Sequence, residues 1–223
     1  MRTRKNSSLA AQAKVESGMQ ASDPKANPKR DAIIQAAVTV FAESGYYNSR
    51  VSDIVKKINA AQGLFYYYFE SKEEMLLTIY QTAWNNLLEF IDRAGREHDG
   101  PLSKIRAVIE YIFKSFRKNP DLMKVLIMDV PRLERFYDEE NQQTWNLLFN
   151  RLAEFVKEGQ EKNLINPEVS PLVAAYIIHA SVDGIIRHNL YNPKFDTEAV
   201  PIETAVDQVV RVLFNGLVDV RIK

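Results

Sequence analysis

The sequence has 223 residues, enough for a large hydrophobic core in one or two domains. Its 29 lysine and arginine residues balance its 29 aspartate and glutamate residues, and it contains no cysteine. The absence of cysteine excludes a disulfide framework, thiolate catalysis and thiolate metal sites, and it is typical of a reducing cytoplasm. There is no apolar run of roughly 18 residues and no apolar N-terminal segment of a secretory signal, so we expect a cytoplasmic protein without membrane contact.

Residues 1–27 differ in composition from the rest of the chain. Basic residues stand at the front, at Arg2, Arg4 and Lys5, and few large apolar residues follow. Such a segment cannot build a core, so it predicts a disordered basic tail. Two interpretations of the tail remain, a solvated segment or an arm that enters the minor groove of DNA.

Two amphipathic helices are predicted next. Asn27 and Pro28 suit the cap and the first position of a helix that Gly45 ends. Its apolar residues recur with helical spacing, at Ile33, Ala36, Ala37, Val40 and Phe41. Ser49 is predicted to cap the second helix, and Asn59 follows where a left-handed residue closes a helix.

A short third helix follows after a turn of about three residues, which is the spacing of a helix-turn-helix. Phe65 and Phe69 share one face and are predicted to be buried. Such a helix lies in the major groove with its first residues towards base edges, and the side chain of Gln62 suits adenine. The candidate DNA-contacting residues of this helix are Gln62, Gly63, Leu64, Tyr66, Tyr67 and Tyr68. For the tyrosines, packing on the core with only the hydroxyl at the surface is the alternative.

The rest of the chain also reads as helices. Ser71 and Glu74 form a capping box that opens a fourth helix, expected to end near residue 96, and Lys72 stands at its start, where an ammonium group can meet a phosphate. Five more helices are predicted between Gly and Pro breaks, over residues 102–117, 121–129, 137–162, 171–189 and 203–221. No strand-like alternation is evident, so the expected fold class is all-α with about nine helices.

Ordered matches run from about Lys29 to Leu76 and include Gly45-Tyr46, Ser49-Arg50-Val51 and the run GLFYYYFESKEEML at residues 63–76. On these residues the sequence resembles the TetR/AcrR family of transcriptional regulators. The resemblance implies a helix-turn-helix DNA-binding domain over residues 28–75 and a helical effector-binding and dimerisation domain over residues 76–223. It also implies a ligand-responsive regulator, usually a repressor, that reads a palindromic double-stranded DNA operator as a homodimer. By the same resemblance, Ser49, Arg50 and Lys72 contact backbone phosphate.

Three residues depart from the family pattern. One is Asn59, which stands in place of the usual glycine and tolerates the left-handed conformation better than most residues. The family usually has a small hydroxyl residue at the position of Ala61 and often threonine at that of Leu64. Ala61 removes a helix cap at a cost of about 1 kcal/mol, while Leu64 can still pack on a thymine methyl group, so we expect an altered sequence preference. The departures at Ala61 and Leu64 also leave open a second function, a helical ligand- or partner-binding module that no longer reads DNA specifically. Gln62, the tyrosines and Lys72 argue against it.

The last two predicted helices have broad apolar faces. By resemblance, they pair with the same two helices of a second subunit in a four-helix bundle. The candidate interface residues are Ile177, Ala180, Gly184, Val209, Leu213 and Leu217. Burial of these faces inside one subunit is the alternative.

Large aromatic and methionine side chains are frequent in the predicted helical body. They are first of all core residues, but a cavity lined by them favours a largely apolar small-molecule effector, such as a fatty acyl chain or an aromatic compound. The candidate effector-binding residues are Trp84, Tyr111, Phe116, Met128, Trp145, Phe149, Tyr176 and His179. Basic residues such as Lys118 and Lys124 could meet an anionic head group, with solvation as the alternative.

An enzymatic function has one feature in its favour. His179 and Asp183 are four residues apart and would face each other on one helix, as in a pair that orients a general base. They are not accompanied by a nucleophile, a metal-spaced histidine cluster or a phosphate-binding glycine loop. We therefore expect no catalytic residues, no metal site and no cofactor.

Overall fold

The structure is a computed structural model that describes residues 27–191 and 202–217. These residues form nine α-helices, two short 3-10 helices and no strand, which confirms the predicted all-α fold class. In chain order they are α2 (Pro28–Ser44), α3 (Val51–Lys57), α4 (Gln62–Tyr68), α5 (Lys72–Glu97), α6 (Pro101–Lys118), α7 (Pro120–Met128), η1 (Val130–Arg132), η2 (Glu134–Tyr137), α8 (Glu139–Glu161), α9 (Pro171–Tyr191) and α10 (Ile202–Leu217). The predicted tail lies outside the described residues except for Asn27, as do the last residues of the final predicted helix.

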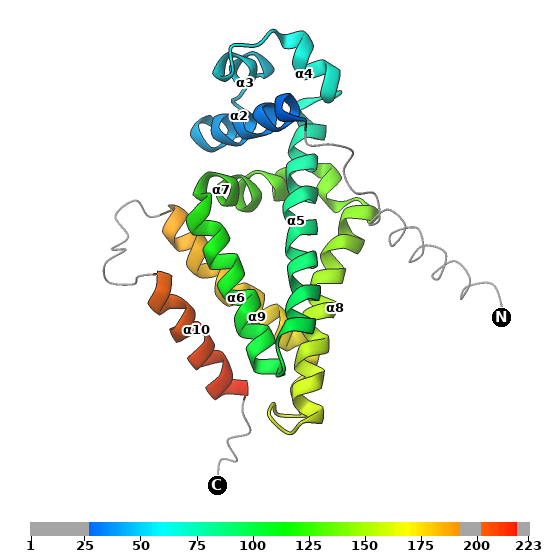
Figure 1. Cartoon of the computed structure of the whole chain (residues 1–223), viewed down its shortest axis with the longest axis vertical. Helices are drawn as coiled ribbons and strands as arrows, with labels where there is room; N and C mark the ends of the chain where they lie inside the picture. Colours follow the sequence, from blue (N-terminus) through cyan, green and yellow to red (C-terminus); the bar gives the residue numbers. More distant parts are fainter. Residues whose placement is uncertain (1–26, 192–201, 218–223) are drawn as a thin grey trace, which may run out of the picture.

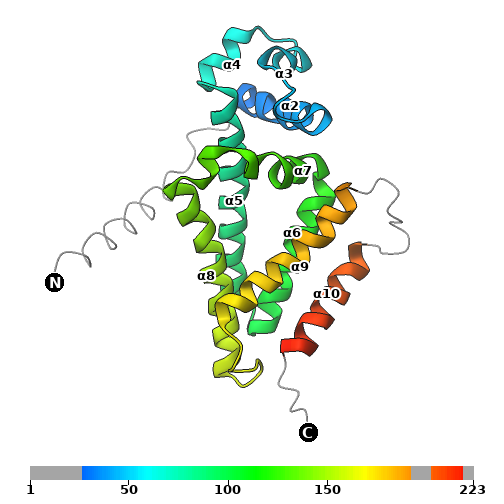
Figure 2. The same cartoon turned by 180° about the vertical axis from the view of Figure 1, so that it is seen from behind.

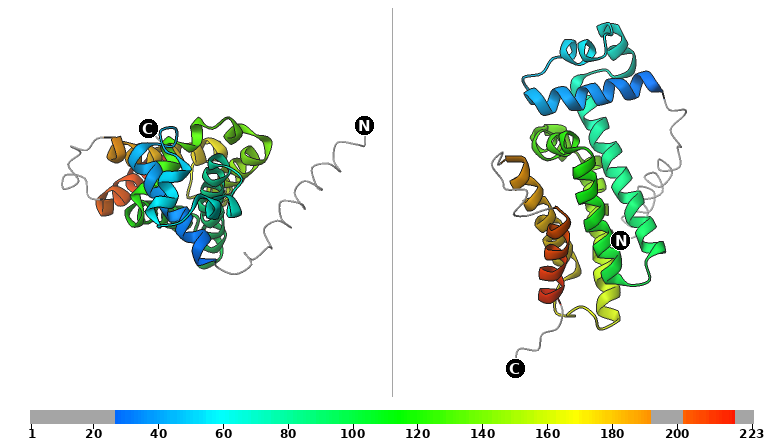
Figure 3. Two further views of the ribbon diagram at one scale, coloured as in Figure 1. Left: turned by 90° about the horizontal axis from the view of Figure 1, so that it is seen from above. Right: turned by 60° about the vertical axis from the view of Figure 1, so that its left-hand side comes forward.

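The helices divide into a head and a body. Figure 1 shows α2, α3 and α4 as a head at one end of the molecule, with α5 running from the head along the body. From behind, α9 runs obliquely across the body towards the far end of α8, and α10 lies outside α9 (Figure 2). Helix α7 lies beneath α2 and packs against it (Figure 3, right). The head therefore rests on α7 as well as on the end of α5.

Local sequence signals explain most of the helix ends in the head. The side chain of Asn27 accepts a hydrogen bond from the Lys29 N–H, and Gly45, with a φ of 78°, ends α2. Asn59 has a φ of 52°, as expected for a left-handed residue after α3. Ser71 caps α5, because its Oγ accepts a hydrogen bond from the Glu74 N–H at 3.0 Å. These four assignments were predicted from the sequence.

The predicted cap of α3 is wrong by one residue. Arg50 occupies the cap position, and its N–H donates to the carboxylate of Asp53 at 2.9 Å. Ser49 is buried, and its hydroxyl donates to the carbonyl of Tyr46 at 2.7 Å. The hydroxyl stabilises the turn between α2 and α3, because a buried polar group needs a partner inside the protein.

Two clusters of buried apolar residues hold the molecule together. The body cluster lies among α5, α6, α8, α9 and α10. The head cluster contains Phe41, Phe65 and Phe69, and it continues into Val125 of α7 and Phe136 of η2. Because α5 is continuous from residue 72 to 97 and contributes to both clusters, the head is joined to the body through packed side chains and not through a flexible linker. Across the described residues, no helix is both long and apolar enough to cross a bilayer.

Candidate DNA-contacting surface and effector cavity

Helix α4 presents aromatic side chains to solvent at the far end of the head. Tyr66 is 57% exposed and Tyr67 is 78% exposed, whereas Phe65 and Phe69 are buried in the head core. Tyr68 is half-buried and meets the Tyr67 ring edge-on, with 4.8 Å between centroids. Large exposed aromatics contribute little to the fold, so they point to a surface that contacts a partner.

The start of α4 is equally open. Gln62 and Gly63 are exposed, Leu64 is half-buried, and Arg50 is exposed at the start of α3. As the sequence predicted, Ala61 provides no side-chain hydrogen bond at the cap of α4. A Cβ atom added to Gly63 would meet no atom within 4 Å. The fold therefore does not require glycine at this position, and we infer that its absent side chain serves a close approach of the backbone to something outside the chain.

A Gly63→Ala variant tests this inference, because stability and binding should change in opposite directions. We expect the free energy of unfolding to rise by about 0.5–1 kcal/mol, since alanine loses less backbone entropy than glycine in a helix. DNA affinity should fall by about tenfold, because the added methyl group enters the contact surface. Urea unfolding and fluorescence anisotropy with labelled DNA measure the two effects, and unchanged affinity would contradict the inferred close approach.

Lys72 is turned towards the protein. Its Nζ donates to the carbonyls of Tyr46 at 2.5 Å and Ser49 at 2.7 Å, and it lies 4.3 Å from the centre of the Tyr46 ring. Burial lowers the pKa of Lys72, against the opposing effect of Asp129 and Asp53. The polar groups of Ser49 and Lys72 are thus engaged within the chain at the turn between α2 and α3, and the phosphate contacts of these residues stay a prediction.

Three long-range hydrogen bonds connect the head to α7 and η1. The Tyr46 N–H donates to the buried carboxylate of Asp129 at 3.3 Å, and the Tyr47 hydroxyl donates to the carbonyl of Arg132 at 2.8 Å. The Lys124 Nζ donates to the carbonyl of Ala42 at 2.6 Å. Burial raises the pKa of Asp129 despite its hydrogen bond from Tyr46 and the nearby cations. We call this set of contacts, between residues 42–47 and residues 124–132, the head–body joint.

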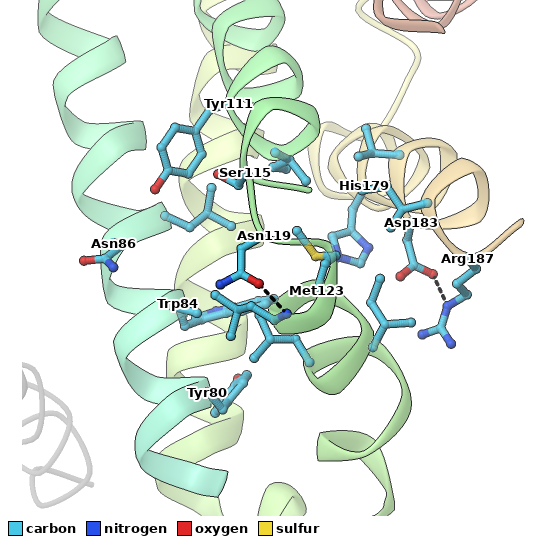
Figure 4. Close-up of a pocket in the computed structure, with 18 of the residues that line it drawn as sticks. Tyr80, Trp84, Asn86, Tyr111, Ser115, Asn119, Met123, His179, Asp183 and Arg187 are labelled. Atoms are coloured by element: carbon cyan, nitrogen blue, oxygen red, sulfur yellow. Dashed lines mark hydrogen bonds and ion pairs between the residues drawn. The ribbon is translucent and has the colours of Figure 1, made fainter. Parts of the chain in front are cut away.

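A cavity of about 710 Å³ lies in the body below the joint. Its wall is mostly apolar and is formed by α5, α6, α7, α8 and α9, with Gln35 of α2 at the side nearest the head. Figure 4 shows Tyr80 and Trp84 of α5 on one side of the cavity and His179, Asp183 and Arg187 of α9 on another. Its size is that of pockets for small molecules of drug-like mass or larger.

The structure brings together half of the predicted effector-binding residues. Trp84, Tyr111, Trp145 and His179 line the cavity. The other four, which are Phe116, Met128, Phe149 and Tyr176, do not line it. Phe116 and Phe149 are buried in the body core instead. The sequence shows which side chains are large and apolar. It does not show which of them face the cavity and which face the core.

Several lining residues were not among the predicted sites. They include Tyr80, Leu87, Ile112, Leu126, Val182 and Arg187. Tyr80 could have been found, since it precedes the predicted residue Trp84 by one helical turn on the same face. Nothing in the sequence distinguishes the aliphatic residues of the cavity wall from ordinary core residues.

His179 is an apolar-facing histidine and not a member of a catalytic pair. It is half-buried, with its ring 5.5 Å from that of Trp145 and 5.3 Å from that of Phe149. The carboxylate of Asp183 pairs with the Arg187 Nε at 2.6 Å, so the predicted partner of His179 is engaged elsewhere. Burial lowers the pKa of His179, partly offset by Asp183 and reinforced by Arg187. The imidazole is therefore neutral at neutral pH.

The lowered pKa of His179 predicts a loss of stability in mild acid. Below the ordinary histidine pKa of 6.5, the unfolded chain takes up a proton that the folded chain resists, so stability falls as the pH drops. We expect the wild type to lose about 1 kcal/mol more than a His179→Gln variant between pH 7.5 and pH 5.5. Urea unfolding of both proteins at the two pH values measures this difference, and parallel losses would contradict it.

Helix α9 carries most of the exposed large apolar side chains of the described body helices. Val173, Tyr176 and Ile177 are each close to half exposed, and Ala180 and Gly184 on the same helix are exposed as well. Val209 and Leu213 of α10, by contrast, are buried in the core of their own chain, and their assignment to a subunit interface stays a prediction. The side chain of Leu217 lies outside the described residues.

Comparison with known proteins gives matches to the head and to the body. The family model for bacterial regulatory proteins of the tetR family matches residues 33–79, which span α2, α3, α4 and the start of α5. The fatty acid metabolism regulator protein of Bacillus subtilis is 25% identical over 191 residues, covering 85% of this chain and 96% of the relative. The match to this relative therefore extends through the body.

Solved structures share the whole architecture. The fatty acid degradation regulator FadR from Bacillus halodurans superimposes with a TM-score of 0.76 at 27% identity, over 87% of this chain and 98% of that one. FadR from Bacillus subtilis, solved in complex with stearoyl-CoA, gives a TM-score of 0.71 at 24% identity, over 84% and 99% of the two chains. The matched head and the shared body together assign the chain: it belongs to the TetR family of bacterial regulatory proteins and is a ligand-responsive, DNA-binding transcriptional regulator rather than an enzyme.

Proposed function

We propose that the protein is a homodimeric repressor that binds a palindromic operator and is released from it by a long-chain acyl effector. The observation that carries this proposal is the apolar cavity of about 710 Å³, because α5 both lines it and continues into the head. Residues 28–75 act as the DNA-binding unit, and residues 76–223 act as the effector-binding and dimerisation unit. A regulator of this kind works in the cytoplasm, where its operator is located.

Helix α4 reads the operator in the major groove. Gln62, Gly63 and Leu64 approach base edges at the start of the helix, and Tyr66, Tyr67 and Tyr68 contact the adjoining bases and sugars. Arg50, exposed at the start of α3, contacts a phosphate. In the homodimer the two copies of α4 lie about one helical turn of DNA apart, near 34–36 Å.

The exposed face of α9 forms the subunit contact. Ile177, Ala180 and Gly184 lie on this face, and a Cβ atom added to Gly184 would meet no atom within 4 Å of its own chain. Small residues of this kind allow a second helix to approach closely. The same face on both subunits gives a closed, two-fold symmetric contact, as a palindromic operator requires.

The apolar wall of the cavity and the names of the relatives both support a long acyl chain as the effector. Most of the cavity wall is apolar, and Asp183 and Arg187, the two charged side chains on α9, are paired with each other. The Bacillus relatives are regulators of fatty acid metabolism or degradation, and one was solved with stearoyl-CoA. Binding moves α5, so that the two copies of α4 no longer match the operator half-sites.

The proposal is tested by titrating stearoyl-CoA into the protein bound to fluorescently labelled operator DNA, with coenzyme A alone as the control. We expect the anisotropy to fall to that of free DNA with stearoyl-CoA and to stay unchanged with coenzyme A. Retention of the complex at saturating stearoyl-CoA would contradict the proposed effector class. Analytical ultracentrifugation of the free protein tests the homodimer, and a monomer at micromolar concentration would contradict it.

A further inference from the structure

Two side chains that line the cavity carry hydrogen-bond donors that have no partner in the described part of the chain. The hydroxyl of Tyr80 and the indole N–H of Trp84 are both inaccessible to solvent, and neither has a hydrogen-bond partner among the described residues. Both residues line the cavity, and Tyr80 is only 2% exposed. They lie one turn apart on α5, with 5.3 Å between their ring centres, and Figure 4 shows them on the same side of the cavity.

Neighbouring rings hold the two donors in place. The Trp84 ring is stacked on that of Trp145, with 4.8 Å between centroids and 13° between planes. The Tyr80 ring meets that of Phe136 edge-on at 5.4 Å. Neither donor can therefore turn towards solvent without breaking these contacts. An unpaired buried donor destabilises the free protein. A bound molecule that supplies the acceptor would remove this cost.

The chemistry of the two donors defines the acceptor. The indole N–H can only donate, and burial raises the pKa of Tyr80, which keeps its hydroxyl protonated. The nearest cation of the cavity wall on α9, Arg187, is paired with Asp183, and Lys118 is exposed at the end of α6. Two neutral donors can replace the hydration of a neutral carbonyl oxygen, whereas a carboxylate loses far more hydration and the α9 cation of the wall is already paired.

We propose that the Tyr80 hydroxyl and the Trp84 indole N–H donate together to the carbonyl oxygen of the effector's acyl group. The cavity then selects an acyl compound with a neutral carbonyl over an alkyl chain of the same length. This inference rests on the proposed function, because it places the polar end of an acyl effector in the same cavity. Since both donors belong to α5, the helix that carries the head, recognition of the carbonyl acts directly on the element that must move.

A pair of ligands that differ by one oxygen atom tests the proposal. Stearoyl-CoA carries the thioester carbonyl, and S-octadecyl-CoA replaces it by a methylene group in a thioether. Isothermal titration below the concentrations at which these compounds form micelles gives both affinities for the wild type, Tyr80→Phe, Trp84→Phe and the control Tyr137→Phe. Tyr137 is exposed and does not line the cavity, so the control removes a tyrosine hydroxyl, which donates to the carbonyl of Pro131, and leaves every lining side chain in place.

The wild type and Tyr137→Phe should prefer the thioester by about tenfold or more, and Tyr80→Phe and Trp84→Phe should lose most of that preference. Unliganded Tyr80→Phe should melt at the same temperature as the wild type or higher, because it no longer buries an unpaired hydroxyl. A full thioester preference in both cavity variants, or none in the wild type, overturns the inference while leaving an acyl effector in place. Absence of binding of either ligand to the wild type removes the proposed effector class itself, and the carbonyl inference with it.

Discussion

A Tyr66→Ala, Tyr67→Ala double variant should lose about 100-fold in affinity for operator DNA and keep the thermal stability of the wild type. The two side chains are 57% and 78% exposed, so most of the surface that the substitutions remove is already in contact with solvent. Each lost contact with a base or sugar costs about 1–3 kcal/mol, and the two together account for the expected loss. Fluorescence anisotropy and thermal unfolding measure the two quantities.

Tyr137→Ala is the matched control for this experiment. Tyr137 is 62% exposed on η2, outside the head, and its hydroxyl donates to the carbonyl of Pro131, so the substitution removes a comparable exposed tyrosine and one hydrogen bond from a different surface. Its DNA affinity should equal that of the wild type. Undiminished DNA binding by the double variant would show that the exposed tyrosines of α4 are not part of the reading surface.

An Asp129→Ala variant should lose about 2–4 kcal/mol of unfolding free energy and bind DNA more weakly. The substitution leaves the Tyr46 N–H without its acceptor and removes a carboxylate that lies near Lys72 and Lys124. The head–body joint then holds the head less firmly, and the two copies of α4 are less well placed for the operator half-sites. Urea unfolding and DNA anisotropy measure the two losses.

Asp129→Asn separates the hydrogen bond from the charge. The asparagine carbonyl can still accept from the Tyr46 N–H, so this variant should recover part of the stability and most of the DNA affinity. If Asp129→Ala is as stable as the wild type and binds DNA equally well, the head–body joint does not position the head.

The sequence predicts the head well because its signals are local. Asn27, Gly45, Asn59 and Ser71 each fix a helix end through a hydrogen bond or a backbone angle within a few residues of themselves. The absence of a cap at Ala61 could be predicted in the same way. The predicted cap of α3 was wrong by one position, because a hydroxyl beside a helix start can either cap the helix or donate to the preceding turn.

The features that depend on tertiary packing could not be predicted. Lys72 is drawn inwards by carbonyls 23 and 26 residues away in sequence, and Asp129 meets the Tyr46 N–H across 83 residues. Apolar periodicity on α10 identified Val209 and Leu213 as buried, but it could not tell the core of one subunit from the contact between two. For the same reason Tyr111 lines the cavity while Phe116, five residues later on α6, faces the core.

Two of the helices that line the cavity, α5 and α7, also contact the head. Helix α7 contributes Met123 and Ile127 to the cavity wall and Lys124 to the joint, and α5 contributes Tyr80 to the cavity and Lys72 to the turn between α2 and α3. A ligand that shifts either helix therefore changes how the head is held. Such a shift requires that the ligand bind more tightly to the released conformation than to the DNA-bound one.

Selection of binding sites from a randomised DNA duplex pool, at two salt concentrations, tests most directly whether this chain reads an operator. We expect enrichment of a palindrome whose half-sites are about one helical turn apart, with weaker retention at the higher salt because phosphate contacts release counterions. The Tyr66→Ala, Tyr67→Ala variant should fail to retain the same palindrome. Enrichment of no sequence at either salt concentration would contradict specific DNA reading by this protein.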